Sequence, residues 1–379
     1  MNGSIRRRGK GTYELTIDLG KDSTGRRKRK FVNVKGTRKE ADRKLRDILA
    51  SLDKGLPVDA GKVSLSEMLQ RWMRDYVVPN TRARTAERYE SDIRLHIEPS
   101  LGHIQLSRLS PADIQAMEAR LLEGGKSARS VQHVHAVLRE SLKHALRWGL
   151  VFRNPAEAVD PPRSSRPEIQ PPSADAVWDI LEAAKETPYH GALVFLAFTG
   201  CRRGEALGLR WTDIDLENSN AAIVQSLQRV KGEGLVFQAP KSAKSRRAIS
   251  LDSDTIDMLR EYRGEQLLRQ VELDGAYSDQ GLVFPGPLGG PIDPSVLTRT
   301  FGKLVRRIGL TATRLHDLRH FHATLLLQQG TNPKVVQERL GHSSFAITMD
   351  TYSHVAPGLQ KQAAQDFALA MEKAKPLNN

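Results

Sequence analysis

The stretch TGCRRGEALGLRWTDID, residues 199–215, decides the fold more than any other part of this sequence. It follows the apolar segment YHGALVFLAF, and its Thr-Gly pair predicts a tight turn at the end of a helix. Two arginines come directly after this turn, where the next helix is expected to begin. We therefore predict that Arg202 and Arg203 lie at the start of a helix.

Two segments further along the chain carry side chains of related chemistry. HDLRHFHATLLLQQG begins with His316 and Arg319, and their spacing of three residues places both on one helix face. The next predicted helix, NPKVVQERLGHSS, starts with an Asn-Pro pair and ends at Gly341, with His342 just beyond it. Ten residues after His342, in SSFAITMDTYSHVAP, stands Tyr352. Each segment alone is a weak signal, so the functional prediction depends on the order and spacing of all of them.

Length and composition limit the classes of protein to which the chain can belong. Its 379 residues suit two or three domains, and a hydrophobic fraction of 39% is enough for packed cores. No stretch of about twenty apolar residues is present, and MNGSIRRRGKG lacks the apolar region of a signal peptide. The single cysteine, Cys201, excludes an internal disulfide and a cysteine-based zinc cage. We expect a cytoplasmic protein without a membrane partner.

The charge distribution favours nucleic acid as a partner. The formal net charge is +14, and residues 1–60 alone carry 17 Lys and Arg against 8 Asp and Glu. A basic excess of this size attracts polyanions such as the phosphate backbone of DNA. Because most of the excess lies in the first sixth of the chain, this segment is the first candidate for DNA contact.

Residues 1–60 predict a small β-sheet with one helix. In GTYELTIDL apolar and polar residues alternate with the period of a half-buried strand, and KFVNVKG is typical of a second strand. TRKEADRKLRDILASLDKG opens with a capping box, Thr37 and Glu40, and predicts a helix. A sheet with basic side chains on its outer face can lie in a DNA groove. The candidate DNA-binding residues here are Arg6, Arg7, Arg8, Arg26, Arg27 and Lys28.

Residues 61–160 predict an all-helical domain. Ser64 and Glu67 form a second capping box, and Ser110 followed by proline is typical of a further helix start. Several arginines cluster around one predicted helix start in this segment, where they can contact phosphate or simply form a solvated helix face. From the segment alone both interpretations stay open. The candidate DNA-binding residues are Arg82, Arg84 and Arg88.

A proline-rich segment separates this part from the rest of the chain. DPPRSSRPEIQPPS holds five prolines without apolar periodicity, so we place a linker at residues 161–172 and a further domain at 173–379. The sequence of that domain predicts helices, then a strand group, then helices to the end; the predicted strands are AAIVQSLQRV, GLVFQAPK and RRAISL. The predicted fold is mixed and multidomain: a small β-sheet plus helix, an all-α domain, and a mainly α domain with a small antiparallel sheet.

Together these motifs resemble one family, the tyrosine recombinases of the phage-integrase type. The resemblance covers essentially the whole chain, and implies an arm-type DNA-binding domain at 1–60, a core-binding domain at 61–160 and a catalytic domain at 173–379. In the family the first catalytic arginine follows Thr-Gly and one variable residue, which matches Arg202 rather than Arg203. The catalytic residues that the resemblance implies are Arg202, Lys241, His316, Arg319, His342 and the nucleophile Tyr352.

The implied chemistry explains why these residue types are needed. Attack of the Tyr352 oxygen on a DNA phosphodiester builds negative charge on the non-bridging oxygens, which Arg202 and Arg319 can meet with planar forks of donors. No metal or other cofactor is then needed. With a reference pKa near 10, tyrosine needs a proton acceptor, and His316 is the candidate. The product is a 3′-phosphotyrosyl linkage whose reversal permits strand exchange without ATP.

Two further roles follow from the same resemblance. The leaving 5′-oxygen needs a proton, for which a lysine on a β-hairpin is the general acid. The matching position is Lys241, and Lys244 remains an alternative. His342 is expected to hydrogen-bond the scissile phosphate, and Glu205 to be the structural companion of Arg202.

The resemblance also implies partners. We expect double-stranded DNA carrying arm-type and core-type attachment sites, and a homotetramer on synapsed DNA that passes through a Holliday junction. An excision factor and a host DNA-bending protein are further candidate partners, and the location would be cytoplasmic and nucleoid-associated. The C-terminal segment 358–376 has apolar residues at helical spacing and is expected to dock on a neighbouring subunit. The implied function is integration and excision of a prophage or an integrative conjugative element.

The sequence also permits other interpretations. His316, His320 and His322 have a zinc-binding spacing, but no His-Glu-x-x-His signature accompanies them, so packing roles are favoured for the last two. Cys201 is interpreted as a small buried side chain in a tight turn. Alternative functions are a DNA-binding protein derived from an integrase without catalysis, and an enzyme like a type IB topoisomerase or a resolvase. The complete catalytic set and the basic first domain favour the integrase.

Overall fold

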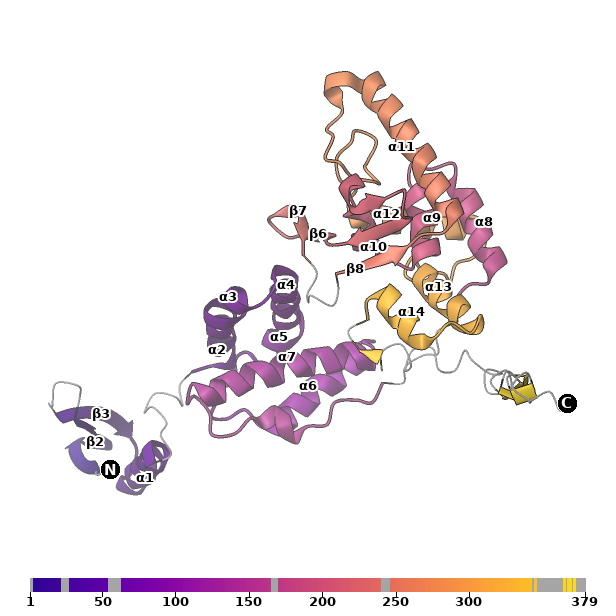
Figure 1. Cartoon of the computed structure of the whole chain (residues 1–379). Coiled ribbons are helices and arrows are strands. Elements are labelled where there is room, and N and C mark those ends of the chain that lie inside the picture. The colour runs from indigo at the N-terminus through magenta and orange to yellow at the C-terminus, as the bar shows by residue number, and fades with distance from the viewer. Residues whose placement is uncertain are drawn as a thin grey trace. The chain divides into compact units, whose positions relative to one another are not determined.

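The computed structural model describes residues 3–21, 27–53, 63–164, 170–239, 246–342 and 344–345, with short pieces at 364–365, 367–369 and 371–372. The chain divides into two compact units, Met1–Arg166 and Pro167–Asn379 (Figure 1). The boundary falls within the proline-rich segment. No helix in the described parts of the chain has the length and apolar character that crossing a bilayer requires.

The first unit begins with an antiparallel three-stranded sheet and a helix. The strands β1 (Gly3–Gly9), β2 (Thr12–Lys21) and β3 (Arg27–Lys35) lie in the order β1-β2-β3, and α1 (Arg38–Asp53) follows. The predicted sheet with one helix is confirmed, but the prediction contained only two strands. The strand β1 was missed because its sequence, GSIRRRG, has one large apolar residue and therefore no alternation to detect.

Alternation along β2 decides which face of this sheet is covered. Leu15 and Ile17 are fully buried and pack with Ala41, Leu45 and Ile48 of α1. The register places Arg6 opposite Glu14, with side chains on the other face of the sheet. Basic side chains of β1 therefore reach the face that α1 leaves open.

The remainder of the first unit, residues 63–164, is helical. Ser64 and Ser110 both accept from the third backbone N–H of their helices, and Glu67 and Asp113 bond back, so two predicted helix starts are confirmed. In Figure 1, α6 and α7 lie side by side. The elements are α2 (Leu65–Trp72), α3 (Val78–Asn80), α4 (Ala83–Asp92), α5 (Glu98–Leu101), α6 (Pro111–Glu123), α7 (Ala128–Arg147) and the 3-10 turn η4 (Pro155–Ala158).

Two π-helical turns, η2 (Met73–Val77) and η3 (Ile93–Ile97), interrupt these helices, and neither was predicted. Each is followed two residues later by a proline, Pro79 or Pro99. A proline has no N–H to donate and its ring clashes with the carbonyl four residues earlier, so a widened turn relieves the conflict without ending the helix. The π-helical hydrogen bonds, which join residues five apart, run from the N–H of Val78 to Met73 O and from the N–H of Glu98 to Ile93 O.

The second unit is mainly helical with two small antiparallel sheets. The apolar helix α9 packs against α8, α10, α11 and α13, which explains its burial on all sides (Figure 1). The helices are α8 (Ala174–Ala184), α9 (His190–Thr199), α10 (Arg203–Leu207), α11 (Ser253–Leu273), α12 (Pro294–Arg307), α13 (Asp317–Gln328) and α14 (Pro333–Leu340), with 3-10 turns η5 (Trp211–Asp213) and η7 (Asp274–Ala276).

The strand group differs in detail from the prediction. Strands β4 (Ile214–Asp215), β5 (Asn220–Ile223) and β8 (Arg247–Ser250) form one sheet, and β6 (Ser226–Val230) with β7 (Gly234–Gln238) forms a separate hairpin. The predicted single strand AAIVQSLQRV is therefore two strands in two sheets. The chain leaves the first sheet at Val224–Gln225, and Gln225 Nε2 donates to Gly208 O at 2.7 Å, a contact invisible in the sequence.

The small core of the first domain gives a test of its stability. Ile17→Ala should cost about 2–5 kcal/mol, because it leaves a cavity in a core that has only five buried apolar residues, Ile17 included. We expect faster amide exchange throughout residues 3–53 of the full chain, measured by mass spectrometry. The neighbouring Thr16→Ala, on the open face of the same strand, is the control. Equal exchange in the two variants would contradict this account of the core.

Candidate catalytic site

The predicted turn at Thr199–Gly200 is present and is sterically demanding. Gly200 ends α9 in the left-handed region at φ 64°, where a side chain is disfavoured. A Cβ at this position would also lie 2.8 Å from both His322 Cδ2 and Leu340 Cδ2. The chain then places Arg202 at the N-cap of α10 and Arg203 at its first position, as predicted. Arg203 turns away and donates to the hydroxyl of Thr298.

Arg202 and a second arginine share the carboxylate of Glu205. Arg202 donates its backbone N–H to Oε2 at 2.9 Å and its Nη1 to Oε1 at 2.8 Å. Arg247 donates Nη2 to Oε2 at 2.8 Å and Nη1 to Oε1 at 3.3 Å. Burial would raise the pKa of Glu205, but the bonds and charge of Arg247, joined by Arg202, outweigh it and lower the pKa to about 2. The carboxylate is therefore ionised throughout the physiological range.

The last three carbonyls before His342 each accept a hydrogen bond from a different arginine. These carbonyls belong to the C-terminal end of α14 and the residue that follows it, where helix carbonyls lack partners within the helix and the dipole favours positive charge. The bonds run from Arg247 Nε to Arg339 O at 2.7 Å, from Arg319 Nη2 to Leu340 O at 2.8 Å, and from Arg202 Nη2 to Gly341 O at 3.2 Å.

Arg319 connects three helices. It is 3% exposed, and its Nη1 donates to Gly200 O at 2.8 Å while Nη2 bonds the end of α14. The arginine itself belongs to α13, so it fixes the ends of α9 and α14 against that helix. The predicted pairing of His316 and Arg319 near one helix start is present, with His316 as the N-cap of α13.

His316 is neutral at pH 7. Its ordinary pKa of 6.5 already lies below that pH. Burial of the ring is the largest cause that lowers this pKa, and repulsion from His320 and Arg319 adds to it, giving a pKa of about 4. The residue as a whole remains exposed, so contact with solvent reduces this lowering of the pKa. The ring is uncharged at pH 7 with either the ordinary or the lowered pKa. The rings of His316 and His320 meet edge to face with centroids 4.9 Å apart. His316 can therefore accept a proton.

His342 lies directly after the arginine-bound carbonyls. Its N–H donates to Gln337 O at 3.1 Å, and Gln337 Nε2 donates to His342 O at 3.2 Å. Burial, followed by the charges of Arg319 and Arg202, lowers the pKa of His342 to about 4. Because Arg319 and Arg202 bond the carbonyls of the two residues before His342, the three residues share one site.

His322 has a packing role, and its contacts define its tautomer. Nδ1 lies 3.2 Å from Ala197 O, which can only accept, so Nδ1 carries the proton. Nε2 then accepts from Arg339 Nε at 3.0 Å. Burial and the charge of Arg339 lower the pKa of His322 to about 3, in agreement with this arrangement. His322 therefore does not join His316 and His320, and no three His, Cys, Asp or Glu side chains gather as a metal site within the described ranges.

Several predicted site residues lie in parts of the chain that the structure does not describe. Lys241, its alternative Lys244, Tyr352 and Arg26 lie outside the described residues. Arg27 and Lys28 belong to β3, without described side chains. Cys201 is buried and burial raises the pKa of its thiol, which suits the packing interpretation.

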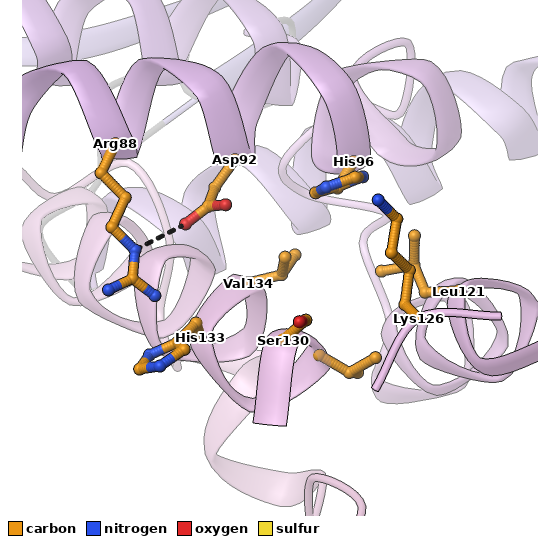
Figure 2. A pocket seen from close by; sticks show the side chains of 9 residues that line it. Arg88, Asp92, His96, Leu121, Lys126, Ser130, His133 and Val134 are labelled. Atoms are coloured by element: carbon orange, nitrogen blue, oxygen red, sulfur yellow. Dashed lines mark ion pairs between the residues drawn. The ribbon is translucent and has the colours of Figure 1, made fainter. Parts of the chain in front are cut away.

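Two of the predicted DNA-binding arginines of the helical part, Arg82 and Arg84, lie at the start of α4, and Arg88 lies further along it. Arg82, Arg84 and Arg88 are exposed, with Arg82 at the N-cap. Figure 2 shows a pocket where Arg88 and Asp92 of α4 face His133 of α7, and the Arg88 Nε to Asp92 Oδ2 distance is 3.7 Å. Lys126 and His133 lie far from Arg88 in sequence, so only the fold brings these basic groups together.

Two of the residues that organise the site were missed from the sequence. Arg247 and Arg339 stand in SRRAISL and QERLGHSS, where neighbouring polar residues give no sign that these arginines turn inward. Arg339 donates Nη1 to Ser250 O at 2.8 Å in addition to its bond with His322. The only available signal for Arg247 was its place among alternating apolar residues at the start of a predicted strand.

Comparison with known proteins identifies the family of this chain. The chain matches the phage integrase family over residues 173–358 and the phage integrase N-terminal SAM-like domain over residues 64–122. It is 32% identical to a tyrosine recombinase XerC-like protein of Caldanaerobacter subterraneus subsp. tengcongensis over 376 residues, which is 94% of this chain and 96% of that protein.

Two solved structures share the fold. The Tn1549 transposon integrase in complex with a circular intermediate DNA superposes with a TM-score of 0.68 at 20% identity, covering 81% of this chain and 100% of that one. The lambda integrase tetramer bound to a Holliday junction gives 0.59 at 20% identity, covering 94% and 96%. The chain belongs to the phage integrase family, and it is a tyrosine recombinase, that is, a site-specific DNA recombinase.

The neutral state of His322 predicts how stability depends on pH. Unfolded His322 takes up a proton near pH 6.5, whereas the folded residue resists protonation until about pH 3, so its contribution is complete above 6.5 and is lost as pH falls. His322→Phe and His322→Asn should each make the loss of stability between pH 6 and 4 shallower, by about 1.4 kcal/mol per pH unit.

The two variants separate titration from hydrogen bonding. At pH 7 His322→Phe should be less stable by about 1–3 kcal/mol, because Arg339 Nε and Ala197 O both lose a partner. His322→Asn can still donate to Ala197 O and should lose less. Urea denaturation followed by amide exchange in α13 measures both quantities. A slope equal to that of the unmodified protein would contradict the assigned protonation state.

Proposed function

We propose that this recombinase cleaves and rejoins DNA through Tyr352 to integrate and excise a mobile element, either a prophage or an integrative conjugative element. The observation that carries the proposal is the convergence of Arg202, Arg319 and His342 on the end of α14. Two guanidiniums fixed within one site suit a phosphodiester whose non-bridging oxygens gain charge during attack. Both remain protonated at any working pH.

Proton transfer completes the proposed reaction. Tyr352 attacks the scissile phosphorus, a bond forms between its oxygen and phosphorus, and the bond to the 5′-oxygen breaks. His316 accepts the tyrosine proton, which its neutral state at pH 7 permits. Lys241, with Lys244 as the alternative, donates a proton to the leaving 5′-oxygen, and His342 bonds the phosphate. Attack of another 5′-hydroxyl on the 3′-phosphotyrosyl linkage reverses these steps and joins a new strand.

We propose three functional regions for the chain. Residues 1–60 bind arm-type sites, 61–160 bind core-type sites, and 173–379 carry catalysis, joined by a linker at 161–172. The open face of the first sheet and the exposed start of α4 support DNA contact by the first two. Four copies would assemble on synapsed DNA in the cytoplasm, with an excision factor and a host DNA-bending protein as further partners.

Covalent trapping tests the reaction. End-labelled fragments from the regions flanking the gene are incubated with the protein in EDTA and separated on a denaturing protein gel. We expect a labelled protein band that Tyr352→Phe abolishes, because the variant has no attacking oxygen. Tyr277→Phe, which removes another hydroxyl from the same unit, should keep the band. Tight binding without any adduct would instead favour a DNA-binding protein without catalysis.

Salt dependence tests the first domain. Each phosphate contact contributes about 0.9 to the slope of log affinity against log salt. Arg6→Gln should reduce that slope by about this amount, because Arg6 lies on the open face of the sheet. Arg46→Gln makes the same charge change on an exposed position of α1 and should leave the slope unaltered. Equal slopes for Arg6→Gln and the unmodified protein in filter binding would count against the proposed groove contact.

A further inference from the structure

Arg247, at the first position of β8, has a buried side chain that the reaction described above does not use. Its side chain is 7% exposed. Both of its terminal nitrogens donate to Glu205, and its Nε donates to Arg339 O at 2.7 Å. One planar group therefore bonds a carboxylate in two places and a helix carbonyl in a third, an arrangement that matches the fixed fork of a guanidinium.

The two acceptors of Arg247 belong to the segments that carry the proposed catalytic groups. Glu205 also accepts from the backbone and the side chain of Arg202, so the orientation of its carboxylate sets where Arg202 lies. Arg339 O is the first of the three carbonyls before His342, and the next two accept from Arg319 and Arg202. Arg247 is thus connected to Arg202 through Glu205, and to Arg319 and His342 through the backbone at the end of α14.

The fit around Arg247 is close. A Cβ built on Gly341 would lie 2.8 Å from Arg247 Nη1, so the backbone next to His342 rests directly against the guanidinium. Gly341 has φ 66° and ends α14 in the left-handed conformation. A movement of the guanidinium would therefore be transmitted to the residue before His342 as well as to Glu205.

We propose that Arg247 is a positioning residue for strand cleavage, fixing the relative placement of Arg202, Arg319 and His342 through Glu205 and the end of α14. This inference rests on the proposed function of those three residues. Arg247 acts through its neighbours and has no role in contacting DNA. A lysine at this position keeps the charge but carries its donors on one nitrogen, so it lacks the planar fork whose three nitrogens each bond a different acceptor here.

The central test compares Arg247→Lys with Arg246→Lys. Arg246 is the adjacent, exposed residue, so the pair makes one chemical change inside and outside the site. The rate of covalent adduct formation is measured at saturating concentrations of the flanking DNA fragment that the unmodified protein cleaves. Arg247→Lys should lower that rate about 10- to 100-fold without weakening DNA binding, because small misplacements of reacting groups have effects of this size. Arg246→Lys should leave the rate within about threefold, well below that loss.

A pH profile and a double-mutant cycle separate positioning from simple loss of folding. Arg247→Gln removes the strongest contribution that lowers the pKa of Glu205, so the pKa rises and the variant should lose activity more steeply than the unmodified protein as pH falls toward 5. In a Glu205→Gln background, Arg247→Lys should have a smaller effect than it has alone. Equal effects in the two backgrounds would overturn the proposed route through Glu205.

A measurement without DNA keeps this inference distinct from the proposed function. The N–H groups of Gly341 and His342 donate to Glu338 O at 3.0 Å and Gln337 O at 3.1 Å. Arg247→Lys should raise amide exchange at these two positions, and Arg246→Lys should not. If the unmodified protein forms no adduct, the proposed function fails, while exchange still decides whether Arg247 orders this segment. Unchanged exchange, or a cleavage rate within threefold of the unmodified protein, would overturn the inference.

Discussion

The C-terminal end of α14 is the constraint on which the site depends. Helix ends leave carbonyls without partners and carry partial negative charge. Here the unmet carbonyls receive guanidiniums from α13, β8 and the N-cap of α10. Elements distant in sequence are therefore connected through one helix end, and His342 follows immediately. Burial, together with the same positive charges that stabilise this end, lowers the pKa of His342.

Glu205 explains how so much positive charge is tolerated. Its single carboxylate lies between Arg202 and Arg247, and the pKa of about 2 shows that ionisation is strongly favoured despite burial. Losing one arginine would leave a buried carboxylate with half of its partners, which is costly. The pKa values of His316 and His342 are lowered first by burial and then by repulsion from nearby positive charges, so both rings are neutral at pH 7. The site therefore separates permanent cations from groups that can accept protons.

Much of this arrangement could be predicted from local sequence, and the rest depended on tertiary contacts. Gly200, the Asn-Pro start of α14 and the two serine caps are local backbone requirements, so their patterns predicted the turns and helix starts. Inward-facing arginines are different, because Arg246 and Arg247 have the same chemistry and only packing distinguishes them. Likewise Val224–Gln225 has no turn residue, and the strand break there depends on a contact with Gly208.

The acceptors at the end of α14 have a consequence for sequence divergence. They are main-chain carbonyls, which every amino acid supplies, so substitution at position 340 by another apolar residue leaves its bond from Arg319 in place. Gly341 is restricted, because its conformation and its approach to Arg247 exclude a side chain, and Arg339 is restricted by the hydrogen bonds that its own side chain makes to His322 and Ser250 O. A site whose arginines bond backbone atoms can tolerate many side-chain substitutions while each arginine keeps the same acceptor. Proteins that share 20% identity with this chain and still share its fold are consistent with that freedom.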